Sequence, residues 1–151
     1  MYSGGGYTVL QLLIEEVTKM PFEKYMSEEV LMPLGMEHSS FANDFTDTNI
    51  SKAYGFFGQA LLNYNYTEKS AAGLKTTVQD FLKFMLASMD GNNGEPKGRE
   101  ILKSENIDLI LNSGLGTFKS ALPDNSAEIG HVGSNKGWTS QYQIIPNKKM
   151  D

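Results

Sequence analysis

The stretch Tyr2-Ser3-Gly4-Gly5-Gly6-Tyr7, followed by Thr8-Val9-Leu10-Gln11-Leu12-Leu13-Ile14-Glu15-Glu16-Val17, decides how the rest of the sequence is interpreted. Apolar residues at positions 10, 13, 14 and 17 recur at helical spacing and predict an amphipathic helix. We interpret the three glycines as a loop ahead of it, because glycine adopts backbone conformations closed to other residues. Tyr2 beside such a loop can act as a proton-transfer group. The alternative is a frayed or ordinarily packed residue near a chain terminus.

Composition places the chain among folded proteins and excludes several functions. Its 151 residues are enough for one domain with a sizeable core. The net charge of −5, without a basic stripe, argues against nucleic acid as a partner. No apolar run reaches the roughly 20 residues that span a bilayer, and no secretory signal is present, so the location is left open. Zero cysteines exclude disulfides. No metal-ligand spacing and no cofactor motif occur.

Further helices are predicted along the first part of the chain. One has Pro21 in its first turn and ends near Gly35. Residues 37–75 lose the periodicity, and their aromatic side chains either line a cleft or anchor the loop to its own core. The next helix is capped by Thr77 and has one apolar face, made by Val78, Phe81, Leu82, Met85, Leu86 and Met89. Ser104 is expected to cap a shorter helix.

Near residue 114 the sequence pattern changes from one typical of helices to one typical of strands. Residues 115–121, 127–131 and 139–145 are predicted strands, the first two joined by a turn at 123–126. A turn at 147–149 implies a further strand that the chain does not contain. We therefore predict an α+β fold for residues 1–151, with a mainly helical part at 1–113 and the beginning of an antiparallel sheet at 114–151. An unpaired sheet edge is expected to favour self-association.

His131 is the more informative of the two histidines. It lies between Gly130 and Gly133 at a predicted strand end, where the glycines allow another backbone to approach. A histidine there can offer a hydrogen bond or a positive charge to an anionic ligand; the alternative is a purely structural role. A nucleophile signature is absent, since neither Gly-x-Ser-x-Gly nor Ser-x-x-Lys occurs in the sequence.

Four segments together resemble the serine β-lactamase and penicillin-binding-protein family, in its class C-like branch. They are, in the family's order, Tyr2–Tyr7, Pro33–Met36, Ala72–Phe81 and His131–Ser134. The resemblance covers nearly the whole chain. It implies a partial β-lactamase/transpeptidase-like fold and a parent serine hydrolase acting on β-lactams, peptides or esters.

The resemblance also implies roles for individual residues. Tyr2 takes the place of the family's catalytic tyrosine, which shares proton transfer with a lysine. The third motif falls on His131, Val132 and Gly133, which would bind substrate, with the backbone N–H of Ser134 as one oxyanion donor. Such pre-aimed donors contribute strongly to acyl transfer. The expected partner is therefore a small-molecule or peptide acyl substrate, and the parent would often be periplasmic or extracellular.

The sequence departs from the family pattern at three places. Gly4 replaces the asparagine of Tyr-x-Asn, and His131-Val132-Gly133 replaces Lys-Thr-Gly, which favours esterase and peptidase relatives over a strict β-lactamase. The Ser-x-x-Lys region would precede Met1, so we expect an internal fragment that is inactive by itself. The alternative is a non-enzymatic ligand-binding or interaction module. A Ser-x-x-Lys motif encoded in frame upstream of Met1 would distinguish the two.

Overall fold

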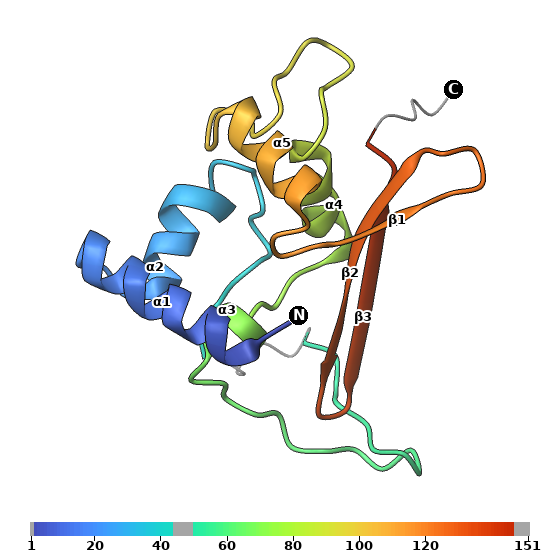
Figure 1. The fold of residues 1–151 in the computed structure, drawn as a ribbon. Coiled ribbons are helices and arrows are strands. Elements are labelled where there is room, and N and C mark those ends of the chain that lie inside the picture. The colour runs from blue at the N-terminus through green and yellow to red at the C-terminus, as the bar shows by residue number, and fades with distance from the viewer. Residues whose placement is uncertain (1, 44–49, 147–151) are drawn as a thin grey trace. The chain divides into compact units, whose positions relative to one another are not determined.

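The computed structural model describes residues 2–43 and 50–146, so the turn expected at 147–149 lies outside the described residues. Within them the helices come first and the strands follow (Figure 1). The elements are α1 (Gly4–Thr18), α2 (Phe22–Met26), the π-helix η1 (Ser27–Leu31), α3 (Lys69–Ala72), α4 (Val78–Ala87), α5 (Ser104–Ser113), β1 (Phe118–Ala121), β2 (Ala127–Asn135) and β3 (Trp138–Ile144). None of the described helices is long and apolar enough to cross a membrane.

The chain forms two compact units. The first comprises Met1–Phe81 together with Ser134–Trp138, and the second comprises Leu82–Gly133 together with Thr139–Asp151. The tip of the β2–β3 hairpin therefore belongs to the first unit, and the rest of the sheet to the second.

Helix α1 begins earlier than the sequence pattern predicted. The three glycines lie inside its first turn and not in a loop ahead of it. The cap is Ser3, whose hydroxyl accepts a hydrogen bond from the Gly6 N–H at 3.1 Å. This side-chain cap satisfies one of the orphan donors of the helix start, and it offsets part of the entropic cost of three helical glycines.

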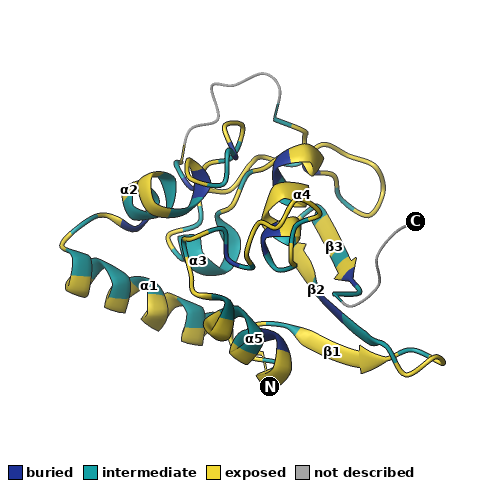
Figure 2. Cartoon of the chain, turned by 90° about the horizontal axis from the view of Figure 1, so that it is seen from above, coloured by how far each residue is buried: buried dark blue, intermediate teal, exposed yellow. Residues whose placement is uncertain are grey.

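The face that α1 packs inward differs from its apolar stripe. Of the predicted face, Ile14 packs against the core, whereas Leu10, Leu13 and Val17 are exposed. The less exposed flank, visible as the teal side of α1 in Figure 2, instead follows a stripe at positions 4, 7, 11, 14 and 18. This stripe also has helical spacing, and its polar members make hydrogen bonds that an apolar stripe could not.

The core of the first unit is a small apolar cluster. Phe22, Leu31, Met36 and Phe41 are buried, and the Phe22 and Phe41 rings meet edge to face at 5.2 Å. Pro21 is the cap of α2 and precedes its first turn, and the helix continues as η1. Gly35 has a positive φ of 69° just beyond the helical segment, as expected for a residue that ends a helix.

In the second unit α5 and the part of α4 from Leu82 onward pack on the sheet. Leu111, Ile129 and Ile144 are buried together, with Met85 and Ile107 against them. Strands β1 and β2 pair antiparallel from Phe118 with Gly130 to Ala121 with Ala127, and the strand order is β1-β2-β3. All three predicted strands are present, but β1 begins at Phe118 and β2 extends beyond residue 131 to Asn135. Part of the predicted α4 face is wrong, because Val78, Leu82 and Leu86 are exposed.

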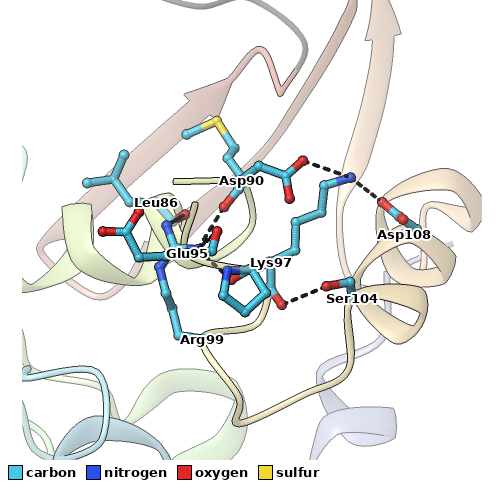
Figure 3. Close-up of polar contacts among 9 residues, drawn as sticks. Leu86, Asp90, Glu95, Lys97, Arg99, Ser104 and Asp108 are labelled. Atoms are coloured by element: carbon cyan, nitrogen blue, oxygen red, sulfur yellow. Dashed lines mark hydrogen bonds and ion pairs between the residues drawn. The ribbon is translucent and has the colours of Figure 1, made fainter. Parts of the chain in front are cut away.

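Two basic side chains organise the loop between α4 and α5 (Figure 3). The Arg99 guanidinium donates to the carbonyls of Leu86 at 2.8 Å and Met89 at 2.9 Å, which satisfies acceptors at the end of α4. Lys97 bonds Asp108 on α5 at 2.7 Å, and this bond raises the pKa of the lysine. The cap predicted at Ser104 is wrong: its hydroxyl donates to the Lys97 carbonyl at 3.2 Å, and Lys103 occupies the cap position.

Candidate active site

Tyr2 lies on the wall of a hollow in the first unit. Its side chain is 52% exposed, and its ring lies 5.7 Å from the ring of Tyr7. The hollow has a volume of about 510 Å³ and is lined by Tyr2, Gly4, Gly5, Thr8, Tyr66, Thr67, Glu68, Ala71, Ala72 and Asn135. The start of α1 thus forms one side, and α3 with the segment before it forms another.

Gly4 and Gly5 line the hollow next to Tyr2 and place no side chain in it. A Cβ built at Gly4 would lie 4.0 Å from the Tyr2 hydroxyl oxygen, which is ordinary van der Waals distance. A Cβ is therefore accommodated at Gly4, the position where the resemblance places an asparagine. The glycine consequently widens the hollow and is not required by crowding.

One side chain on α1 fixes the opposite wall. The Gln11 amide donates to the Thr67 carbonyl at 3.3 Å and accepts from the Ser70 N–H at 3.1 Å. The Ser70 hydroxyl in turn donates to the Tyr7 carbonyl at 2.7 Å. These three bonds tie the segment that holds Tyr66, Thr67 and Glu68 to the helix that follows Tyr2.

The hairpin tip completes the lining. The Asn135 side-chain amide donates to the Ala72 carbonyl at 3.2 Å, at the end of α3. The two-residue turn ends at Gly137, whose φ of 83° favours glycine. A Cβ on Gly137 would come within 2.8 Å of the Ala53 Cβ, so glycine is also needed there for packing. The hollow therefore brings Tyr2 together with Asn135, the residue that follows Ser134.

The charges around the hollow are unevenly distributed. Hydrogen bonds from its own backbone amide and from the Thr67 hydroxyl hold the pKa of Glu68 below its usual value. The neighbouring Lys69 forms an ion pair with Glu23 at 2.9 Å, and this pair lowers the pKa of Glu23. Lys136 donates to the Tyr64 hydroxyl and lies 4.7 Å from the centre of that ring.

His131 and Gly133 belong to the second unit, whereas Tyr2 and Ser134 belong to the first. The prediction that His131 ends a strand is wrong, because β2 continues to Asn135. The imidazole is stacked on Phe118 at 4.8 Å, and its Nδ1 lies 2.6 Å from the Val132 carbonyl oxygen. It borders a smaller recess of about 110 Å³ that Phe118, Glu128 and Tyr142 also line.

The close approach predicted beside His131 is present at Gly130. A Cβ there would overlap the carbonyl oxygen of Tyr142 on β3. At Gly133 the nearest atom is the flexible Ser140 hydroxyl. Glycine is therefore required by the sheet at Gly130 and less strictly at Gly133.

The sequence pattern did not point to Glu68 and Asn135, which line the hollow, or to Gln11, which holds its wall. A signal existed for Gln11, since it shares a helical stripe with Tyr7 and Ile14. For Glu68 and Asn135 the sequence offers none, because their place depends on the path of the chain. Among the described residues no group of three or more His, Asp or Glu side chains could hold a metal ion.

Comparison with known proteins defines the class. The structure is similar to an octameric penicillin-binding protein homologue from Pyrococcus abyssi, with a TM-score of 0.79, 24% identity, and coverage of 99% of this chain and 36% of that one. It is also similar to the D-alanine carboxypeptidase AmpC from Burkholderia cenocepacia, with a TM-score of 0.73, 16% identity, and coverage of 96% and 52%. The α+β architecture is thus part of a β-lactamase/transpeptidase-like fold.

The sequence comparisons identify the family. The family model described as Beta-lactamase matches residues 1–150, and the chain therefore belongs to the beta-lactamase family of serine hydrolases. A beta-lactamase of Yersinia enterocolitica is 28% identical over 103 residues, which are 68% of this chain and 26% of that protein. Protein flp of Staphylococcus aureus is 30% identical over 101 residues, 59% and 20% respectively. The chain spans about a quarter or less of the length of these relatives.

Proposed function

We propose that this chain supplies the proton-transfer and substrate-binding part of an acyl-transfer site that acts on β-lactam, peptide or ester substrates. The observation that carries the proposal is the position of Tyr2 on the wall of the hollow of about 510 Å³, with its phenol partly exposed. Ligand sites are commonly concave and hold a few placed polar groups. Here those groups include the Tyr2 hydroxyl, Thr8 and Asn135.

We carry the roles of the other residues over from the family resemblance of their motif. His131 and Gly133 are assigned to substrate binding along β2, and the Ser134 N–H to the stabilisation of an oxyanion. The stacking of His131 on Phe118 supports a fixed orientation of the imidazole. The edges of the sheet at β1 and β3 are the surfaces through which we propose self-association.

The 151 residues by themselves are expected not to turn over such substrates. A serine hydroxyl is a weak nucleophile unless an adjacent base activates it, and the sequence contains no Ser-x-x-Lys. The purified chain is incubated with a chromogenic β-lactam and with an activated ester, and its intact mass is then measured. We expect hydrolysis at the background rate and no acyl adduct. An adduct on any serine would overturn this prediction.

Tyr2→Phe tests the role of the hollow. The substitution removes the hydroxyl and keeps the ring, so we expect a dipeptide amide to bind about two- to tenfold more weakly, as for one lost hydrogen bond of roughly 0.5–1.5 kcal/mol. Binding is followed through the backbone amide NMR signals of Gly5 and Ala72. Tyr25→Phe, a change outside the lining, is the matched control. Equal affinity of wild type and Tyr2→Phe would contradict the assignment.

A further inference from the structure

The hollow has the electrostatic character of a site for a cation. Among the described residues that line it, Glu68 is the one charged side chain, and the others are neutral. Its carboxylate accepts a hydrogen bond from the Thr67 hydroxyl at 2.8 Å. Thr67 is in turn held by Gln11 on α1. The position of the Glu68 carboxylate is therefore fixed by hydrogen bonds that run through Thr67 to α1.

The nearest lysines along the chain do not neutralise this charge in the lining. Lys69 follows Glu68 directly, but its ammonium group is paired with Glu23 on α2 and its side chain is 15% exposed. Lys136 follows Asn135, but its ammonium group is bonded to Tyr64. Neither lysine lines the hollow. A substrate carboxylate would therefore meet like charge at Glu68 without a compensating cation from these two residues.

The remaining walls suit a cation as well. Two tyrosines, Tyr2 and Tyr66, contribute to the lining, and the faces of aromatic rings attract ammonium groups. Glu68 remains ionised to lower pH than an ordinary glutamate, because the hydrogen bonds it accepts stabilise the carboxylate. Gly4 and Gly5 in the first turn of α1 also line the hollow, and the partial positive charge of this helix end, about half an elementary charge, offsets only part of the charge of Glu68.

We propose that the hollow selects acyl substrates that carry a free ammonium group, such as amides or esters of amino acids and peptides with an unblocked amine, and that Glu68 determines this preference. The inference deepens the proposed function and rests on it. Glu68 acts here in binding and takes no part in proton transfer by Tyr2.

Three small ligands of similar size test the preference. Alanine amide carries an ammonium group, N-acetylalanine amide is neutral, and N-acetylalanine carries a carboxylate. Their affinities for the full chain are measured from the amide NMR signals of Thr67 and Ala71, at a pH where the amine is protonated. We expect alanine amide to bind about fivefold more tightly than the neutral ligand, as for a partly exposed ion pair, and N-acetylalanine to bind most weakly. Added salt should reduce the difference.

Glu68→Gln isolates the charge. Glutamine keeps an acceptor for the Thr67 hydroxyl, so the wall is retained while the charge is lost, and the fivefold preference should fall to about one. Glu37→Gln removes an exposed carboxylate of the same unit outside the hollow, and it should leave the preference unchanged.

The outcomes separate the inference from the proposed function. If the ligands shift the signals of the hollow but bind equally, or if Glu68→Gln keeps the preference, then the selection of ammonium groups is wrong and the acyl site stands. If none of the three ligands shifts these signals, the hollow is not a substrate site and both proposals fail. A preference lost in Glu68→Gln and kept in Glu37→Gln supports both.

Discussion

Replacing Asp80 with alanine is expected to lower the free energy of unfolding of the first unit by about 3–5 kcal/mol, because two hydrogen bonds to a charged group are lost. The carboxylate is fully buried, at 0% exposure. Its Oδ2 accepts from the His38 N–H at 2.7 Å and from the Ser39 hydroxyl at 3.0 Å. The partly buried His38 N–H would lose this acceptor, whereas the Ser39 hydroxyl would keep its hydrogen bond with the Thr76 hydroxyl at 2.7 Å.

The hydrogen bonds of Asp80 connect two segments that are distant in the sequence. Next to His38 and Ser39, the backbone groups of Ser40 and Lys75 exchange two hydrogen bonds of 2.9 Å. The carboxylate thus fastens the segment after η1 to the start of α4. This pairing lies directly after α3, so the loss of Asp80 is also expected to loosen the wall of the hollow at Ala72.

Unfolding by urea, followed through the fluorescence of Trp138, measures the effect, since the single tryptophan belongs to the first unit. Asp80→Asn keeps one oxygen acceptor and should cost less, about 1–2 kcal/mol. His38→Ala is the matched control: the imidazole is exposed and the bond comes from the backbone, so we expect a change within roughly 0.5 kcal/mol. If Asp80→Ala lowered the free energy of unfolding by less than about 1 kcal/mol, the proposed stabilising role of the Asp80 carboxylate would be contradicted.

Gly98→Ala is expected to destabilise the second unit by about 2–5 kcal/mol, as the sum of a left-handed backbone and a steric overlap. Gly98 is buried and has a φ of 82°. An added Cβ would overlap the carbonyl oxygen of Leu102 and lie 3.3 Å from the Ile107 side chain. Its N–H also bonds the Ala87 carbonyl at 2.7 Å, so the backbone cannot move away without breaking that bond.

Gly94→Ala is the control that measures the destabilisation caused by the left-handed backbone without a steric overlap. Gly94 also has a positive φ, 91°, but nothing lies within 4 Å of an added Cβ. We expect a loss of about 1 kcal/mol there. Amide hydrogen exchange at Ile129 and Ile144, both in the core of this unit, reports the two losses. Equal losses at the two positions would show that the overlap at Gly98 is relieved by movement of Leu102.

The neighbours of Gly98 in the sequence add to the expected loss of stability. It lies between Lys97 and Arg99, whose side chains connect α5 and the end of α4 to the intervening loop (Figure 3). A displaced backbone at Gly98 would move both side chains away from their partners. The cost would then include charge-assisted hydrogen bonds as well as the overlap.

Several local features could be predicted from the sequence because their causes lie within a few residues. Thr77 caps α4 as expected, accepting from the Asp80 N–H at 3.2 Å, since capping requires only the right hydroxyl three residues earlier. The strands followed from alternation and turn residues. The family resemblance, confirmed over residues 1–150, was likewise present in short motifs and their order.

Other features depended on partners that are distant in the sequence. The Asp80 carboxylate lies in the first turn of α4, and only the structure shows its bonds to His38 and Ser39, about forty residues away. The inward stripe of α1 was wrongly placed because apolar periodicity was taken as the guide, whereas Gln11 packs inward to bond Thr67 and Ser70. Periodicity shows which faces a helix has, but not what lies against them.

By itself, then, the sequence determined the order of the longer helices and the strands, though not α3, as well as the family and Tyr2 as the candidate proton-transfer residue, because each of these is encoded in local spacing. Only the tertiary structure decided that Tyr2, Glu68 and Asn135 line one hollow, and that the neighbouring Lys69 is drawn to Glu23. The physical reason is that the charge and shape of a site are set by side chains brought together from distant segments, which short-range patterns do not record.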